Sequence, residues 1–238
     1  EHPSLCAGWS VHDVAAHLVN NALATPVGVV RAMVRAGFDF DRQNDRPPRH
    51  PYHQSVIYEA HVKGMTATHP DVPEHLRGTY AGLCHPVIID HLKSLRITAI
   101  ELMPVSEFPG GRNWGYDGVL PYAVEASYGS PDDLKALVDE AHSLGIMVFL
   151  DVVYNHFGPD GNYLATYADA FFRKDLQTPW GPSIDFREPH VRRYFIDNAL
   201  MWLQEYRFDG LRFDAVHAIS ERDFLNPGSN EADEFVVE

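Results

Sequence analysis

Short apolar runs and longer amphipathic stretches follow one another along most of this chain. Four β-prone runs are short enough to be buried strands: residues 55–62, 97–105, 147–153 and 210–216. Three stretches between them repeat apolar positions three and four residues apart, which predicts helices: residues 86–95, 131–144 and 189–206. Strands that alternate with helices form a parallel sheet with helices packed outside. The predicted fold class is therefore α/β.

The two ends of the chain depart from this pattern. Ser10 is a good N-cap for a helix with an apolar face, and residues 26–36 predict a second helix, so residues 1–45 form an expected helical hairpin. Residues 46–54, rich in proline and basic residues, read as a linker. Residues 55–225 form the α/β domain, and residues 226–238 are an acidic, loop-like tail.

The charge balance narrows the class of partner. The chain of 238 residues has 19 basic and 33 acidic residues, which gives a net charge of −14. This excess of acid argues against nucleic acid and anionic membranes as partners and suits a neutral polysaccharide.

The cysteines and the hydropathy pattern indicate a compartment. Cys6 and Cys84 lie far apart without a CxxC spacing, so neither a zinc site nor a disulfide framework is expected. No apolar run approaches the roughly 18 residues of a membrane span, and the first residues lack a signal-peptide pattern. We expect a cytoplasmic protein.

Two charged residues interrupt the last apolar run. Arg212 and Asp214 are two positions apart, so they face the same side of a strand, and His217 follows where the loop begins. One interpretation is a structural ion pair at a strand end. The other is chemical, because a carboxylate beside a guanidinium stays ionised and suits a nucleophile.

A second motif favours the chemical interpretation. The run Asp151-Val-Val-Tyr-Asn155-His156 ends the third apolar strand, and with Gly-Leu-Arg212-Phe-Asp214-Ala-Val-His217 it resembles the first two signature regions of the α-amylase superfamily of glycoside hydrolases. The resemblance implies an eight-stranded (β/α)8 barrel, of which this chain would hold the first four strands. The motif residues would lie at the carboxyl ends of their strands, where such barrels place their sites.

The resemblance also implies a role for each motif residue. Asp214 would be the nucleophile and Arg212 the cation that keeps it ionised, with Asp151 orienting Arg212. Substrate-binding positions would line the subsite of the reacting sugar: Asn155, His156 and His217, together with Tyr116 of the Trp-Gly-Tyr element, whose ring would stack on the sugar. No cofactor and no metal ion are expected.

A retaining enzyme of this family also needs an acid/base carboxyl group about 5 Å from the nucleophile. In the family it is a glutamate on the fifth barrel strand, which this sequence does not reach. We therefore expect a truncated hydrolase that is inactive alone, with self-association through the open barrel edges as a further expectation. A non-catalytic glucan-binding fragment is the alternative.

Different segments resemble different groups. Residues 55–105 resemble glycogen-debranching enzymes of the isoamylase type, and residues 106–225 resemble malto-oligosyltrehalose trehalohydrolases. The expected substrate is thus an α-1,4-glucan or maltooligosyl trehalose. Residues 1–45 resemble the start of mycothiol-dependent maleylpyruvate isomerases and DinB-like bundles, in which a metal-binding histidine matches His17. One histidine makes no metal site, so a metal-using isomerase is the weakest hypothesis.

Overall fold

A computed structural model describes residues 47–219 of the chain. The chain divides into two units, Glu1–Arg46 and Pro47–Glu238, with a boundary at the start of the predicted linker. The hairpin expected in residues 1–45, including His17, and the acidic tail expected in residues 226–238 lie outside the described residues.

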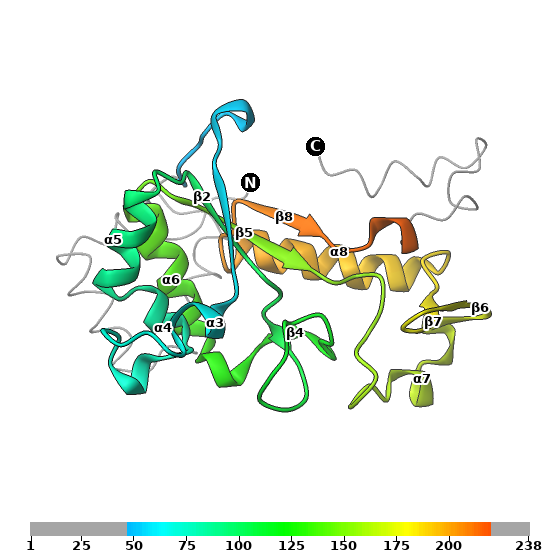
Figure 1. Cartoon of the computed structure of the whole chain (residues 1–238). Helices are drawn as coiled ribbons and strands as arrows, with labels where there is room; N and C mark the ends of the chain where they lie inside the picture. Colours follow the sequence, from blue (N-terminus) through cyan, green and yellow to red (C-terminus); the bar gives the residue numbers. More distant parts are fainter. Residues whose placement is uncertain (1–46, 220–238) are drawn as a thin grey trace, which may run out of the picture. The chain divides into compact units, whose positions relative to one another are not determined.

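Four parallel strands form the central sheet, as the apolar runs predict. They are β1 (Ile57–Ala60), β2 (Ala99–Leu102), β5 (Met147–Val152) and β8 (Gly210–Phe213), in the order β1-β2-β5-β8 (Figure 1). Each is somewhat shorter than predicted. Strand β2 ends before Pro104, which has no N–H to donate to a neighbouring strand.

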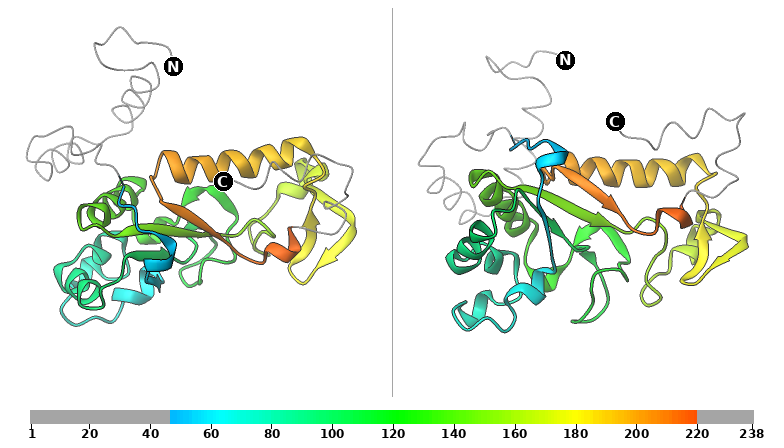
Figure 2. Two further views of the ribbon diagram at one scale, coloured as in Figure 1. Left: turned by 90° about the horizontal axis from the view of Figure 1, so that it is seen from above. Right: turned by 45° about the horizontal axis from the view of Figure 1, so that its top comes forward.

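The three predicted helices are present at the expected positions. They are α5 (Pro86–Ser94), α6 (Pro131–Ser143) and α8 (Pro189–Gln204), and each begins with proline, whose missing N–H costs nothing at that position. Ser130 caps α6 through a reciprocal capping box with Asp133, and Gly145 follows the helix with a φ of 74°. Figures 1 and 2 show α8 lying alongside the sheet near β8.

Two antiparallel hairpins were not predicted. One pairs β3 (Ser106–Glu107) with β4 (Leu120–Val124), and the other pairs β6 (Phe172–Thr178) with β7 (Gly181–Ile184). Short helical segments complete the connections: η2 (Tyr52–Gln54), α3 (Val62–Thr66), η3 (Glu74–Leu76), α4 (Tyr80–Leu83), η4 (Ala126–Tyr128), α7 (Leu164–Tyr167), η5 (Asp169–Phe171) and η6 (Val216–Ala218). None has the length or the periodicity by which a helix is recognised in sequence.

The core lies between the sheet and its helices. Alternate residues of β5, namely Val148, Leu150 and Val152, are buried, and they join a cluster that includes Leu134 of α6 and Phe195 of α8. On the opposite face of the sheet, Glu59 and Arg212 are exposed, whereas Asp151 is buried. Strands β1 and β8 form the two edges of the sheet, consistent with the first half of a (β/α)8 barrel.

Within residues 47–219, no helix is long and apolar enough to cross a membrane.

Candidate active site

The centre of the site is a charged pair on two neighbouring strands. Asp151 of β5 and Arg212 of β8 are register partners, and Arg212 Nη1 donates to Asp151 Oδ1 at 3.0 Å and Oδ2 at 2.9 Å. The Asp151 side chain has no exposed surface, whereas that of Arg212 is 45% exposed. This confirms the predicted direct contact, which follows from parallel pairing of the two motif strands.

Asp214 is held by the same guanidinium. Its Oδ1 accepts from Arg212 Nη1 at 2.9 Å, and its backbone N–H donates to Val152, which prolongs the pairing of β8 with β5. The next residue, Ala215, has a φ of 44°, a left-handed conformation that is uncommon for a residue with a side chain. The chain thus turns sharply after Asp214 and leaves its carboxylate at the carboxyl end of the sheet.

Tyr116 makes a contact that the sequence does not reveal. Its hydroxyl donates to Asp151 Oδ2 at 2.7 Å, so Asp151 accepts hydrogen bonds from both Tyr116 and Arg212. Gly115 permits this placement, because a Cβ there would lie 2.2 Å from the Pro104 carbonyl oxygen. Tyr116 is therefore fixed at its hydroxyl, and its partly buried ring lies beside the charged pair.

Burial and hydrogen bonding act in opposite directions on these groups. Burial raises the pKa of Asp151, while the hydrogen bonds from Tyr116 and Arg212 lower it. Burial lowers the pKa of Arg212, but its bonds to Asp151 and Asp214 more than offset this and hold the pKa above the usual arginine value. The guanidinium therefore stays charged and keeps two carboxylates in fixed orientations.

Asn155 and His156 follow β5, and both are buried. Asn155 Nδ2 lies 2.9 Å from His156 Nδ1, a contact that orients both side chains. Burial lowers the pKa of His156, although the nearby charges of Asp214 and Asp117 act in the opposite direction. A neutral imidazole therefore lies close to Asp214 at neutral pH.

An unpredicted residue, Trp180, covers His156. The two rings stack with centroids 4.8 Å apart and an interplanar angle of 17°. Trp180 lies in the turn between β6 and β7. In the sequence, the only signal for it is the short motif Thr-Pro-Trp-Gly, which resembles trehalohydrolases. His217 falls in η6, directly after the turn at Ala215. Its predicted role stays a prediction.

One group of side chains could offer three ligand atoms to a metal ion. Carboxylate oxygens of Glu59, Glu101 and Asp151 lie within 4.8 Å of one another on β1, β2 and β5. Asp151 already accepts hydrogen bonds from Tyr116 and Arg212. The cluster is explained without a metal as three acidic side chains on neighbouring parallel strands, one of which is paired with Arg212.

This cluster predicts a pH-dependent stability. Glu101 pairs in register with Glu59, and its pKa is raised, first by burial and then by the charges of Asp151 and Glu59. The folded chain therefore holds this proton more tightly than the unfolded chain, so stability is lost as pH rises from the ordinary glutamate pKa through the raised one. Glu101→Gln is expected to increase the free energy of unfolding at pH 7 by a few tenths to about 1 kcal/mol, and to have little effect near pH 4.

Urea unfolding at the two pH values measures this difference. Glu74→Gln, at an exposed glutamate of η3, is the matched control and is expected to change stability by less than about 0.5 kcal/mol. A lower stability of Glu101→Gln at pH 7 would contradict the prediction and indicate that the charged carboxylate is needed, as at a cation site.

The fold agrees with comparisons to known proteins. Residues 67–181 match the model of the α-amylase catalytic domain. The pullulanase of Paenibacillus barengoltzii, solved with maltohexaose and α-cyclodextrin, superposes with a TM-score of 0.68 and 27% identity over 82% of this chain and 35% of its own. The described part of the chain is therefore similar, in sequence and in fold, to the α-amylase family of glycoside hydrolases.

Two curated relatives are more similar in sequence. Malto-oligosyltrehalose trehalohydrolase of Deinococcus radiodurans is 52% identical over 161 residues, 68% of this chain and 25% of that protein. The glycogen operon protein GlgX homolog of Mycobacterium bovis is 44% identical over 211 residues, 76% of this chain and 29% of that protein. The chain thus spans about a quarter to a third of these relatives. They lend no support to the isomerase resemblance of residues 1–45.

Proposed function

We propose that this chain carries the nucleophile half of a retaining α-glucan hydrolase, of the malto-oligosyltrehalose trehalohydrolase or glycogen-debranching type. One observation carries the proposal: Arg212 Nη1 bridges the buried Asp151 and the more accessible Asp214 at the carboxyl ends of adjacent strands. A purely structural pair would be complete with Asp151 alone. The second carboxylate on the same guanidinium is what a nucleophile requires.

In this proposal Asp214 attacks the anomeric carbon of a glucosyl unit. A carboxylate oxygen forms the new bond, and the glycosidic oxygen leaves with the bonding pair. Arg212 aims Asp214 through its hydrogen bond, while Asp151, fixed by Tyr116, prevents the guanidinium from turning away. In the same proposal, His156, Asn155 and His217 would line the subsite that holds this sugar.

No glutamate on the described strands serves as the acid/base in this proposal. Glu59 and Glu101 lie within β1 and β2, and Glu107 in β3 accepts from the backbone N–H of Ala126 at 2.8 Å. None of them lies after the fourth strand of the sheet, where the family resemblance puts the acid. Three expectations stay predictions: a specificity for trehalohydrolysis or for debranching, a cytoplasmic location, and self-association through the edges of the sheet.

A reagent that does not need the acid tests the nucleophile directly. In 5-fluoro-α-D-glucosyl fluoride the leaving group is fluoride, which departs without protonation, and the ring fluorine slows hydrolysis of the glycosyl ester. We expect one 5-fluoroglucosyl unit to be attached per chain, on the peptide that contains Asp214, and none in Asp214→Asn. Mass spectrometry of the intact protein and of its peptides provides the measurement.

Two other results would change the conclusion. A folded chain that binds maltohexaose by calorimetry but is not labelled would favour the non-catalytic glucan-binding fragment. Labelling of a carboxylate other than Asp214 would show that the nucleophile is wrongly assigned.

A further inference from the structure

His61 lies directly after β1 and makes polar contacts through both of its ring nitrogens. Nδ1 accepts from the backbone N–H of Gly64 at 2.8 Å, which makes His61 the N-cap of α3. Because Nδ1 accepts here, the hydrogen of a neutral imidazole lies on Nε2, which donates to the Asn113 carbonyl at 2.8 Å. One side chain therefore begins a helix and holds a loop 52 residues further along the chain.

Aromatic packing fixes the plane of this imidazole. The buried Tyr128 lies edge-on to His61, with ring centroids 5.8 Å apart and an interplanar angle of 82°. The Tyr128 hydroxyl also lies 3.1 Å from His61 Nε2. The rings of Tyr80 and Phe108 pack edge-on against Tyr128 in turn, at 5.8 and 5.9 Å. The imidazole therefore has one orientation, with Nε2 toward the loop.

Asn113 extends this attachment to the turn that carries Tyr116. Its Oδ1 accepts from the Gly115 N–H at 2.8 Å, and its Nδ2 donates to Asp117 Oδ2 at 2.8 Å. Gly115 and Asp117 flank Tyr116 in the sequence. The two hydrogen bonds close the turn, so the position of Tyr116 depends on where Asn113 is held.

A second attachment holds the far end of the turn. The Gly158 N–H donates to the Gly118 carbonyl at 3.0 Å. A Cβ at Gly158 would lie 2.1 Å from the Asp117 carbonyl oxygen, so only glycine permits this approach. Tyr116 lies between the two attachments, and its hydroxyl donates to Asp151 Oδ2 at 2.7 Å. The turn is therefore fixed at both ends around the residue that reaches the site.

We propose that His61 is a positioning residue that holds Tyr116 against Asp151. It acts through Asn113 and the turn that follows. This inference rests on the proposed function, in which Asp151 orients the guanidinium that aims Asp214. It adds a residue at the end of the first strand to a site built on β5 and β8.

Two substitutions separate this role from the capping of α3. His61→Asn keeps a side-chain acceptor near the Nδ1 position and is a good N-cap, but it is too short to place an N–H at the Nε2 position. His61→Gln places its amide N–H near the Nε2 position and is the poorer cap. A positioning role predicts damage in His61→Asn and rescue in His61→Gln, whereas a role limited to capping predicts the reverse order.

Trypsin cleavage of the Arg112–Asn113 bond measures the attachment directly. Arg112 is exposed, and cleavage after it is limited by release of Asn113 from the fold. We expect peptide mass spectrometry to show cleavage about fivefold faster in His61→Asn, because one hydrogen bond is lost, and near the wild-type rate in His61→Gln. Equal rates in the wild type and His61→Asn would overturn the inference.

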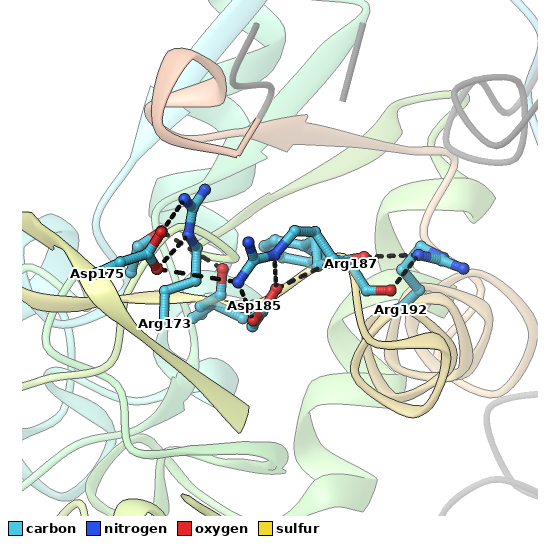
Figure 3. A network of polar contacts seen from close by, with 8 residues as sticks. Arg173, Asp175, Asp185, Arg187 and Arg192 are labelled. Atoms are coloured by element: carbon cyan, nitrogen blue, oxygen red, sulfur yellow. Dashed lines mark hydrogen bonds and ion pairs between the residues drawn. The ribbon is translucent and has the colours of Figure 1, made fainter. Parts of the chain in front are cut away.

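A polar network on the other hairpin supplies a matched control (Figure 3). Arg187 donates to both carboxylate oxygens of Asp185, just after β7, at 2.8 and 2.7 Å, and Arg192 of α8 donates to the Arg187 carbonyl at 3.0 Å. Asp185→Asn disturbs this network, which lies on a different hairpin from Asn113, and is expected to leave cleavage after Arg112 at the wild-type rate. Equally fast cleavage in Asp185→Asn and His61→Asn would overturn the inference, because any loosening of the fold would then expose the bond.

Labelling of Asp214 tests whether the attachment acts through Tyr116. His61→Asn is expected to slow labelling by 5-fluoro-α-D-glucosyl fluoride about fivefold, and to cause no further loss in Tyr116→Phe, which lacks the hydroxyl. An equal loss in both backgrounds would overturn the positioning role. Thermal unfolding of each variant identifies any that does not fold.

The two measurements separate this inference from the proposed function. Trypsin cleavage needs no sugar, so an unlabelled wild type in which His61→Asn still speeds cleavage would overturn the nucleophile and leave the attachment of Tyr116 intact. A labelled wild type with equal cleavage in both proteins would overturn the role of His61 alone.

Discussion

Purified by itself, the 238-residue chain is expected to hydrolyse neither maltooligosyl trehalose nor α-1,6 branches above an Asp214→Asn control. The physical reason is that no residue of the described strands lies where the acid/base is required. That group protonates the leaving oxygen and later activates the incoming water. Each positioned proton transfer is typically worth about 10² to 10⁴ in rate, so the loss of both steps leaves no measurable turnover. Chromatographic detection of released trehalose and glucan provides the assay.

Labelling by 5-fluoro-α-D-glucosyl fluoride distinguishes a missing acid from a missing nucleophile. Fluoride needs no proton to leave, so the same chain that fails on natural glycosides is expected to be labelled at Asp214. Release of trehalose or glucan that disappears in Asp214→Asn would contradict the prediction. An acid would then be supplied by a residue of this chain or by a second copy.

Replacing Arg212 with methionine is expected to lower the free energy of unfolding at pH 7 by about 2 to 3 kcal/mol. Asp151 is fully buried and would lose the cation that donates to both of its oxygens, which leaves an uncompensated buried charge. This loss of unfolding free energy is smaller than is typical when a fully buried ion pair is broken, because the Arg212 side chain is 45% exposed. Tyr116 would still donate one hydrogen bond to Asp151.

The loss is expected to depend on pH in a defined direction. Burial raises the pKa of Asp151, and the hydrogen bonds from Arg212 oppose that rise, so the variant has a still higher pKa there. A carboxyl group whose pKa is raised on folding costs stability as pH rises from its unfolded value through its folded value. The deficit should therefore be small near pH 4 and grow toward pH 7.

Urea unfolding of Arg212→Met at both pH values measures this. Arg193→Met breaks an exposed pair with Asp197 on α8 and is the matched control, expected to cost less than about 0.5 kcal/mol at either pH. A deficit of Arg212→Met that is the same at pH 4 and pH 7 would show that lost packing of the arginine stem, and not an unpaired charge, is the cause.

Contacts between neighbouring strands could be predicted from the sequence. A strand alternates its side chains with a period of two, and parallel strands meet with their carboxyl ends at one edge. Arg212 and Asp214 therefore had to face one side, and once β5 and β8 are neighbours in register Asp151 is within reach. The helices between the strands were equally determined, by apolar periodicity and by ends such as Ser130 and Gly145.

The surroundings of this pair depended on the tertiary structure. The hydrogen bond from Tyr116 to Asp151 joins residues 35 positions apart, and the stacking of Trp180 on His156 depends on a hairpin with no clear strand pattern. The proximity of Glu59, Glu101 and Asp151 depends on which strands are neighbours and on their register. Loop paths have no periodic signal in sequence, because they are set by packing between distant segments, and so only the folded chain decides what covers the site.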